Sequence, residues 1–188
     1  MGSEVMSDSE VKSTPIRGLR GDRPVRRESA RLEFTEESPT VTDPLLEEFE
    51  IASLADRPAV IEASFEALAR VLSFGDRDRF VTRLCLDEAI TNACEHGCLE
   101  TAGPVTVSLF ADPPRWALRV RDRGPGYSQS DVASREVDPY AEGGRGLPIL
   151  DGYAERVVVS DGGREVTVWL ESGTEGSEAT GSSGATGE

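Results

Sequence analysis

One predicted helix places an amide and two carboxylates on a single stripe of its surface. Residues 86–97 read LDEAITNACEHG, and at about 100° per residue Glu88, Asn92 and Glu95 fall on one side while the apolar residues fall on the other. A side-chain amide oxygen such as that of Asn92 is a hard ligand suited to Mg²⁺, and the Glu88 carboxylate one turn earlier could accept a proton. The alternative for this stripe alone is an ordinary solvated helix face.

A second motif, DRGPG at residues 122–126, follows directly after a predicted strand. Gly124 and Gly126 would let a flat ligand approach the backbone closely. The Asp122 carboxylate could accept a hydrogen bond from an exocyclic amine such as that of adenine. Taken alone, the same pattern is equally compatible with a simple turn.

A third motif, GGRGL at residues 143–147, leads into a short predicted helix. Backbone N–H groups of Gly144 and Gly146 at a helix N-terminus would suit a phosphate, and Arg145 could add positive charge. The stretch lacks the Gly-Lys-Ser/Thr ending of a Walker loop, and no strand immediately precedes it as in a dinucleotide-binding fold. A glycine-rich helix entry without any ligand is the alternative.

These motifs need helices and strands to bring them together, and the hydrophobic pattern predicts a framework. Helices are expected over residues 56–72, 76–96 and 147–153, and strands over 46–54, 104–110, 116–121, 156–160 and 165–170. The later strands come as hairpins. We therefore predict an α+β fold, a two-layer α/β sandwich in which a mainly antiparallel mixed sheet carries its helices on one face.

The composition predicts one folded domain between two tails. We expect a disordered N-terminal arm over residues 1–44, the domain over 45–171 and a disordered C-terminal tail over 172–188, because both ends are polar and lack a sustained period. The arm contains a basic stretch that is either a solvated tail or a docking segment for a partner. Its arginines are Arg17, Arg20, Arg23, Arg26, Arg27 and Arg31.

Charge and hydropathy limit the partners and the compartment. A net charge of −15 argues against direct nucleic-acid binding, and there is no run of about 18 apolar residues to span a membrane. The polar N-terminus does not have the pattern of a secretory signal, so we expect a cytoplasmic protein. Three cysteines fit a reducing compartment. Cys94, Cys98 and His96 could form a metal site, but buried thiols on a helix are the favoured alternative.

Together, the order and spacing of the three motifs resemble those of the histidine-kinase-like ATPase superfamily, with its Bergerat-type ATP site. The resemblance runs from about residue 48 to residue 170, and within the superfamily the chain is most similar to the anti-sigma factor serine/threonine kinases. Residues 86–97 correspond to their asparagine box, and residues 122–126 and 144–147 to their two glycine boxes. The resemblance implies an ATP-dependent kinase that sequesters a sigma factor and phosphorylates an anti-anti-sigma (STAS) protein.

The resemblance also implies a role for each matching residue. Asn92 would hold Mg²⁺, and Glu88 would activate the attacking protein hydroxyl. Asp122 would bind the adenine amine, with Gly124 and Gly126 admitting the ring. The rest of the ATP site would be a lid over residues 127–142, the phosphate-binding Gly144, Arg145, Gly146 and Leu147, and His96 near the phosphates. A homodimer formed through the N-terminal strand region is implied as well.

Three other functions remain open at this point. The main alternative is a non-catalytic ATP-binding regulatory module that switches partners according to the bound nucleotide. A sensor histidine kinase fragment would need an acceptor histidine, but the single histidine, His96, lies inside the asparagine box. An ATPase of the gyrase or mismatch-repair type would need a transducer domain, for which we expect too little length.

Overall fold

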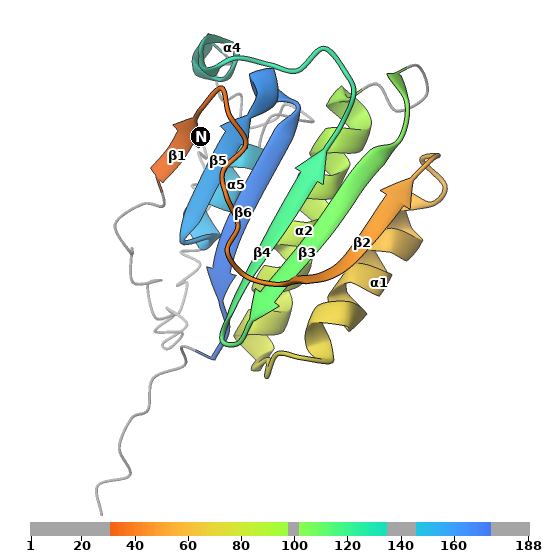
Figure 1. The fold of residues 1–188 in the computed structure, drawn as a ribbon, viewed down its shortest axis with the longest axis vertical. Coiled ribbons are helices and arrows are strands. Elements are labelled where there is room, and N and C mark those ends of the chain that lie inside the picture. The colour runs from red at the N-terminus through yellow and green to blue at the C-terminus, as the bar shows by residue number, and fades with distance from the viewer. Residues whose placement is uncertain (1–30, 98–101, 135–145, 174–188) are drawn as a thin grey trace, which may run out of the picture.

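The computed structural model describes residues 31–97, 102–134 and 146–173, which form a sheet with helices on one face (Figure 1). The strands are β1 (Arg31–Phe34), β2 (Leu45–Ile51), β3 (Val105–Asp112), β4 (Arg115–Arg121), β5 (Arg156–Ser160) and β6 (Glu165–Glu171). The helices are α1 (Arg57–Ala69), α2 (Asp76–His96), α4 (Gln129–Ser134) and α5 (Gly146–Tyr153), and a 3-10 turn, η1 (Asp161–Gly163), joins β5 to β6.

The six strands lie in the order β1-β5-β6-β4-β3-β2. Strands β1 and β5 run parallel, and every other neighbouring pair is antiparallel. Helices α1, α2 and α5 cover the same face of this sheet (Figure 1). The predicted α+β fold, a two-layer sandwich with a mainly antiparallel mixed sheet, is therefore confirmed.

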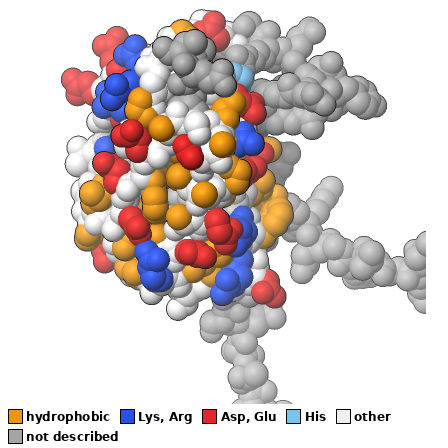
Figure 2. Space-filling model, turned by 90° about the vertical axis from the view of Figure 1, so that its right-hand side faces the viewer, with side chains coloured by type: hydrophobic (Ala, Val, Ile, Leu, Met, Phe, Trp, Pro, Cys, Tyr) orange, Lys and Arg blue, Asp and Glu red, His pale blue; other side chains and the backbone are white. Residues whose placement is uncertain are grey.

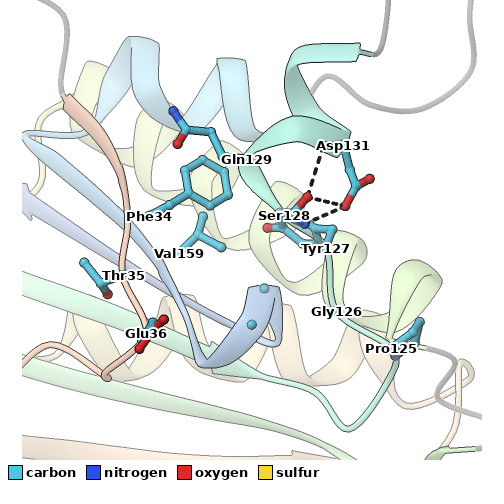
Figure 3. Close-up of a pocket in the computed structure, with 12 residues that line it drawn as sticks. Phe34, Thr35, Glu36, Pro125, Gly126, Tyr127, Ser128, Gln129, Asp131 and Val159 are labelled. Carbon is cyan, nitrogen blue, oxygen red and sulfur yellow. Dashed lines mark hydrogen bonds between the residues drawn. The ribbon is translucent and has the colours of Figure 1, made fainter.

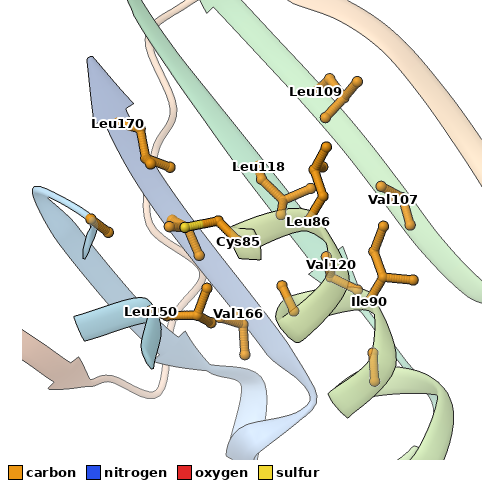
Figure 4. Close-up of a cluster of buried hydrophobic side chains, with 14 of the residues drawn as sticks. Cys85, Leu86, Ile90, Val107, Leu109, Leu118, Val120, Leu150, Val166 and Leu170 are labelled. Carbon is orange, nitrogen blue, oxygen red and sulfur yellow. The ribbon is translucent and has the colours of Figure 1, made fainter. Parts of the chain in front are cut away.

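The hydrophobic core fills the space between the sheet and these helices (Figure 4). Alternate strand residues point into it, so that Val107 of β3 and Leu118 of β4 are fully buried. Helix α2 contributes Leu86 and Ile90, which are four residues apart and also fully buried. Burial of this side of α2 leaves the stripe that contains Asn92 facing away from the sheet.

Helix α2, which carries the first motif, begins at a well-defined N-terminus. The Gly75 N–H donates to Oδ2 of Asp78 at 3.3 Å, and Asp76 and Asp78 place negative charge in the first turn. Both features favour a helix that starts here, because they satisfy a free N–H and complement the helix dipole. The observed bounds of α2 match those predicted.

Strand β1 lies inside the segment that we expected to be a disordered arm, so that prediction is wrong for residues 31–44. Leu32 and Phe34 of β1 register with Val157 and Val159 of β5 and pack against the core. A strand of four residues is too short to show a period in the sequence, and its partner is far along the chain. Residues 1–30 and 174–188, to which the remaining tail predictions apply, lie outside the described residues.

After β1 the chain crosses the outer face of the sheet to reach β2 on the opposite edge (Figure 1). Two contacts hold this crossing: Arg119 of β4 donates to the carbonyl of Pro39, and the Ala111 N–H donates to the carbonyl of Pro44 at 3.0 Å. Beneath it, the Arg119 Nε lies 3.4 Å from the carboxylate of Glu165, which is 2% exposed. The sheet therefore carries a buried carboxylate, paired with a partly exposed arginine, on the face opposite the helices.

The surface on the side of β2 and α1 mixes charged and apolar side chains (Figure 2). Several carboxylates there are paired with arginines, as in Glu47 with Arg70 and Glu62 with Arg83, each pair at 2.6 Å. None of the helices in the described part of the chain is both long and apolar enough to cross a membrane.

Candidate nucleotide-binding site

The first and third motifs meet where Asn92 of α2 lies against Gly146, the first residue of α5. A Cβ atom added to Gly146 would lie 2.7 Å from Cγ of Asn92 and 2.9 Å from its Oδ1. These distances are well below ordinary van der Waals contact, so only glycine fits at residue 146 while Asn92 keeps its position. The N-terminus of α5, with its free N–H groups, is thereby placed beside the Asn92 amide.

The second motif meets the end of α2 in the same way. A Cβ atom on Gly97 would lie 2.7 Å from Cγ of Asp122, and one on Gly124 would lie 2.6 Å from Cα of Gly97. The φ angle of Gly97 is −75°, so glycine is required here for close packing and not for an unusual backbone conformation. The loop after β4 is thus fixed directly against the helix that carries Asn92.

Asp122 is held as a buried hydrogen-bond acceptor. Its side chain is 9% exposed, and the Gly124 N–H donates to Oδ1 at 2.7 Å. Burial raises the pKa of Asp122, while the Gly124 N–H and the charges of Arg164 and His96 oppose that shift. The electrostatic influence of His96 on Asp122 indicates that this exposed histidine lies on the same side of the site.

Glu88 lies one turn before Asn92 and is half-buried. Burial raises the pKa of Glu88, and the nearby carboxylates of Asp87 and Glu95 raise it further. A higher pKa brings a carboxylate closer to the value that suits a proton acceptor at neutral pH. Glu95, the third member of the predicted stripe, differs in its surroundings because it lies 3.6 Å from Arg57 at the start of α1.

The turn between β5 and β6 supports the loop of the second motif, a role that the sequence analysis missed. The Tyr127 N–H donates to the carbonyl of Gly162 at 3.1 Å. Gly163 has a φ of +85°, and a Cβ atom there would lie 2.8 Å from the carbonyl carbon of Tyr127. The sequence signal for this supporting role was the pair of adjacent glycines, Gly162 and Gly163. Such a pair indicates a simple hairpin turn equally well.

Asp161 fixes the conformation of this supporting turn. Its carboxylate accepts one hydrogen bond from Arg121 and one from Arg164, each at 2.7 Å. These two guanidinium groups lower the pKa of Asp161 to about 2. The turn is therefore clamped to β4 just before Asp122.

The lid predicted over residues 127–142 is described only in its first part. The carboxylate of Asp131 accepts hydrogen bonds from the N–H and the hydroxyl of Ser128, both at 2.7 Å, and α4 begins immediately after. Gly144 and Arg145, with the rest of the lid, lie outside the described residues. The side chain of Leu147 is buried in the core, so its backbone is the part that could face a ligand.

Comparison with known families shows that residues 51–170 match the family described as histidine kinase-like ATPase domain. The chain belongs to this family. None of the curated proteins compared with the chain matches it. The matched region contains all three motifs and excludes β1. ATP is therefore the ligand of the domain, and the chemistry of the family is ATP-dependent phosphotransfer or ATP hydrolysis.

The residues of this ATPase domain fit an adenine nucleotide. Asp122 offers a buried acceptor for an N–H group of the base. Gly97, Gly124 and Gly146 form close contacts that a Cβ atom would obstruct, and these contacts join Asp122 to Asn92 through the end of α2. The assignment of individual roles to these residues stays a prediction.

A cavity of about 480 Å³ lies beside the second motif of the ATPase domain (Figure 3). It lies between β1, the loop and the supporting turn, with Phe34, Tyr127 and Val159 among its apolar lining residues. None of Glu88, Asn92 and Asp122 lines it. Gly126 and the first residues of the predicted lid do line it, so the cavity adjoins the predicted position of the adenine ring.

The cysteines of the ATPase domain do not support the alternative of a thiolate metal site. Cys94 is buried, and burial raises the pKa of its thiol, which disfavours the thiolate form that binds metals. Cys98 lies outside the described residues. Across residues 31–97, 102–134 and 146–173, no group of three His, Cys, Asp or Glu side chains is placed to hold a metal ion.

Proposed function

We propose that this ATPase domain is an anti-sigma factor with ATP- and Mg²⁺-dependent serine/threonine protein kinase activity. It would sequester a sigma factor and phosphorylate an anti-anti-sigma (STAS) protein. The observation that carries the proposal is the position of Glu88 one turn before Asn92, with Asn92 held against Gly146 at the start of α5. This arrangement brings a proton acceptor close to the place where the phosphates would lie.

The described side chains fit the work that such a kinase requires. Asn92 would hold Mg²⁺ through its amide oxygen, and the bound ion would neutralise charge on the phosphate oxygens. A carboxylate oxygen of Glu88 would accept the proton of the substrate hydroxyl. The hydroxyl oxygen would bond to the γ-phosphorus as the bond between that phosphorus and the ADP oxygen breaks. The raised pKa of Glu88 favours this proton transfer.

The binding half of the proposal is tested by nucleotide titration with and without Mg²⁺. Wild type should bind ATP more tightly when Mg²⁺ is present, because Asn92 would hold an ion that neutralises phosphate charge. In Asn92→Ala the gain from Mg²⁺ should disappear while Mg²⁺-independent binding persists. A wild type that fails to bind any adenine nucleotide would refute this half.

The kinase half is tested by incubation with ATP, Mg²⁺ and a purified STAS protein from the same organism. Glu88→Gln should reduce phosphate incorporation by roughly 100-fold or more and leave ATP affinity unchanged, because a general base typically contributes about 10²–10⁴-fold. If wild type binds ATP but transfers no phosphate, the alternative becomes the better account: a non-catalytic ATP-binding module that switches partners.

We further propose that the protein acts in the cytoplasm as a homodimer, without direct contact with nucleic acid or membrane. The net charge of −15 supports the exclusion of nucleic acid, since the surface would repel phosphate backbones. Light scattering in the presence of ATP would test the dimer. A mass that stays at 20.2 kDa over all concentrations would refute it.

A further inference from the structure

Strand β1 contacts the loop of the second motif, although β1 lies outside the region that matches the family. The contact is made by Phe34, the last residue of β1, and by Tyr127, the residue that follows Gly126. Their ring centroids are 6.5 Å apart and their planes are at 82°, which is an edge-to-face arrangement. This contact joins one edge of the sheet to the loop that begins at Asp122.

Strand β5 fixes the position of Phe34. Phe34 registers with Val159 in the parallel ladder, and the N–H of Thr35 donates to the carbonyl of Val159 at 2.9 Å. The Phe34 side chain is half-buried and packs against the hydrophobic core. Since both its backbone and its side chain are held by the sheet, Phe34 offers the Tyr127 ring a fixed surface.

The backbone of Gly126 and Tyr127 is held by a different element, the turn η1. The Tyr127 N–H donates to the carbonyl of Gly162 at 3.1 Å. Gly126 has a φ of +70°, and a Cβ atom there would lie 3.1 Å from the carbonyl carbon of Gly162. The end of the loop therefore has two supports: η1 holds its backbone, and β1 contacts the ring of Tyr127.

The cavity beside the loop gives the Tyr127 ring room to move. Phe34, Tyr127 and Gly126 all line this space of about 480 Å³ (Figure 3). A side chain at the border of an open volume can turn into it without a clash, because it meets no packed atoms there. A shorter side chain at residue 34 would enlarge the cavity and release the Tyr127 ring, and the backbone of Gly126 would become less constrained as well.

We propose that Phe34 is a positioning residue for ATP binding. Its ring holds Tyr127, and thereby the loop from Asp122 to Gly126, in the arrangement that receives the adenine ring. The effect of Phe34 falls on the base side of the site, because Asn92 on the predicted phosphate side is placed by its contact with α5. The inference rests on ATP as the ligand of the domain and does not require the proposed kinase function.

Hydrogen exchange of the Tyr127 amide tests the proposal without any ligand. Phe34→Leu keeps an apolar side chain but removes the ring, and one aromatic pair changes an equilibrium by about twofold to tenfold. The Tyr127 N–H, which donates to Gly162, should therefore exchange faster by about the same factor. Phe34→Tyr keeps the ring and should show the wild-type rate. A wild-type exchange rate in Phe34→Leu would overturn the proposal.

Leu32→Ala is the matched control for packing of the same strand. Leu32 registers with Val157 and packs against the core, but it does not line the cavity. Its truncation should loosen the packing of β1 at least as much as Phe34→Leu does, and still leave Tyr127 exchange and ATP affinity at wild-type values. If Leu32→Ala changes both quantities as Phe34→Leu does, Phe34 only stabilises β1 and the proposal fails.

Isothermal titration with ATP measures the consequence for binding. Phe34→Leu should raise the Kd for ATP by about twofold to tenfold, because binding must then restore the position of the loop. The increase should be the same with and without Mg²⁺, since the metal side of the site is unchanged. Phe34→Tyr should bind ATP as wild type does. A loss confined to the Mg²⁺-dependent part of binding would refute the role on the base side.

Tyr127→Leu provides a second variant that leaves β1 intact, so it stays decisive if Phe34→Leu does not fold. It should weaken ATP binding at least as much as Phe34→Leu, and unchanged affinity would contradict the proposal. Adding Phe34→Leu to Tyr127→Leu should cause no further loss, because the ring that Phe34 contacts is already absent; losses that add in full would show that Phe34 does not act through Tyr127. None of these measurements uses phosphate transfer, so failure of this inference and failure of the kinase proposal can be distinguished.

Discussion

Replacement of Gly146 by Ala is the sharpest test of the contact between the first and third motifs. The new Cβ would lie 2.7 Å from Cγ of Asn92, about 1 Å inside ordinary carbon contact. Asn92 is a short side chain with two rotatable bonds, so it can swing away without moving the backbone. We expect Gly146→Ala to fold normally but to displace the Asn92 amide from its wild-type position.

The size of the effect follows from the distortion that binding would then require. Returning the Asn92 amide to its place would force its side chain roughly 30° from a rotamer, which costs about 0.5–1.5 kcal/mol. Because about 1.4 kcal/mol corresponds to a tenfold change in Kd, the Mg²⁺-dependent affinity for ATP should fall by about twofold to tenfold. The free energy of unfolding without nucleotide should change by less than about 1.5 kcal/mol.

Isothermal titration with ATP, with and without Mg²⁺, measures the first quantity, and urea unfolding measures the second. Gly152→Ala in the same helix is the matched control, because a Cβ atom there meets no other atom within 4 Å. It should leave ATP binding unchanged and increase stability by up to about 1 kcal/mol through helix propensity. If Gly146→Ala bound ATP with the same Mg²⁺-dependent affinity as wild type, the contact between Gly146 and Asn92 would not be what positions the Asn92 amide.

Three further changes should have distinct results. Asp122→Asn should weaken ATP binding by at least about tenfold in the isothermal titration, because it removes a charged acceptor for the adenine amine. Unchanged affinity for ATP would contradict that role of Asp122. Asp161→Asn should lower stability above the ordinary aspartate pKa. Its difference from wild type should shrink as pH falls through about 2, because wild-type Asp161 then becomes protonated too. Thermal unfolding across this range would show a constant difference if the reasoning is wrong. Arg119→Ala should reduce the free energy of unfolding by about 3 kcal/mol, because Glu165 would stay buried without its cation. Urea unfolding measures this loss, and a loss below about 1 kcal/mol would indicate that water reaches Glu165.

Much of the fold could be predicted because its elements are long and periodic. The helix at residues 76–96 and the hairpin strands at 104–121 show clear spacing, and the structure places α2, β3 and β4 within two residues of those bounds. Two short elements, β1 and α4, were missed. Strand β1 has four residues and depends on a partner beyond residue 150, and α4 depends on the local capping of Ser128 by Asp131.

The candidate site was predictable in its motifs but not in its supports. The contacts of Gly146 with Asn92 and of Gly97 with Asp122 bring the three motifs together as the resemblance implied. By contrast, the support of Tyr127 by η1 is a tertiary contact that no local pattern encodes. The roles assigned to Gly144 and Arg145 fall outside the described residues and stay predictions.

Strand β1 also has a consequence for the solubility of the domain. Its partner β5 is apolar from Val157 to Val159, and without β1 the backbone N–H and C=O groups along that edge would lack strand partners. Exposed apolar edges of this kind recruit strands from other molecules and lead to aggregation. Strand β1 thus protects the β5 edge of the sheet. A chain that lost β1 should aggregate while its helices are still folded.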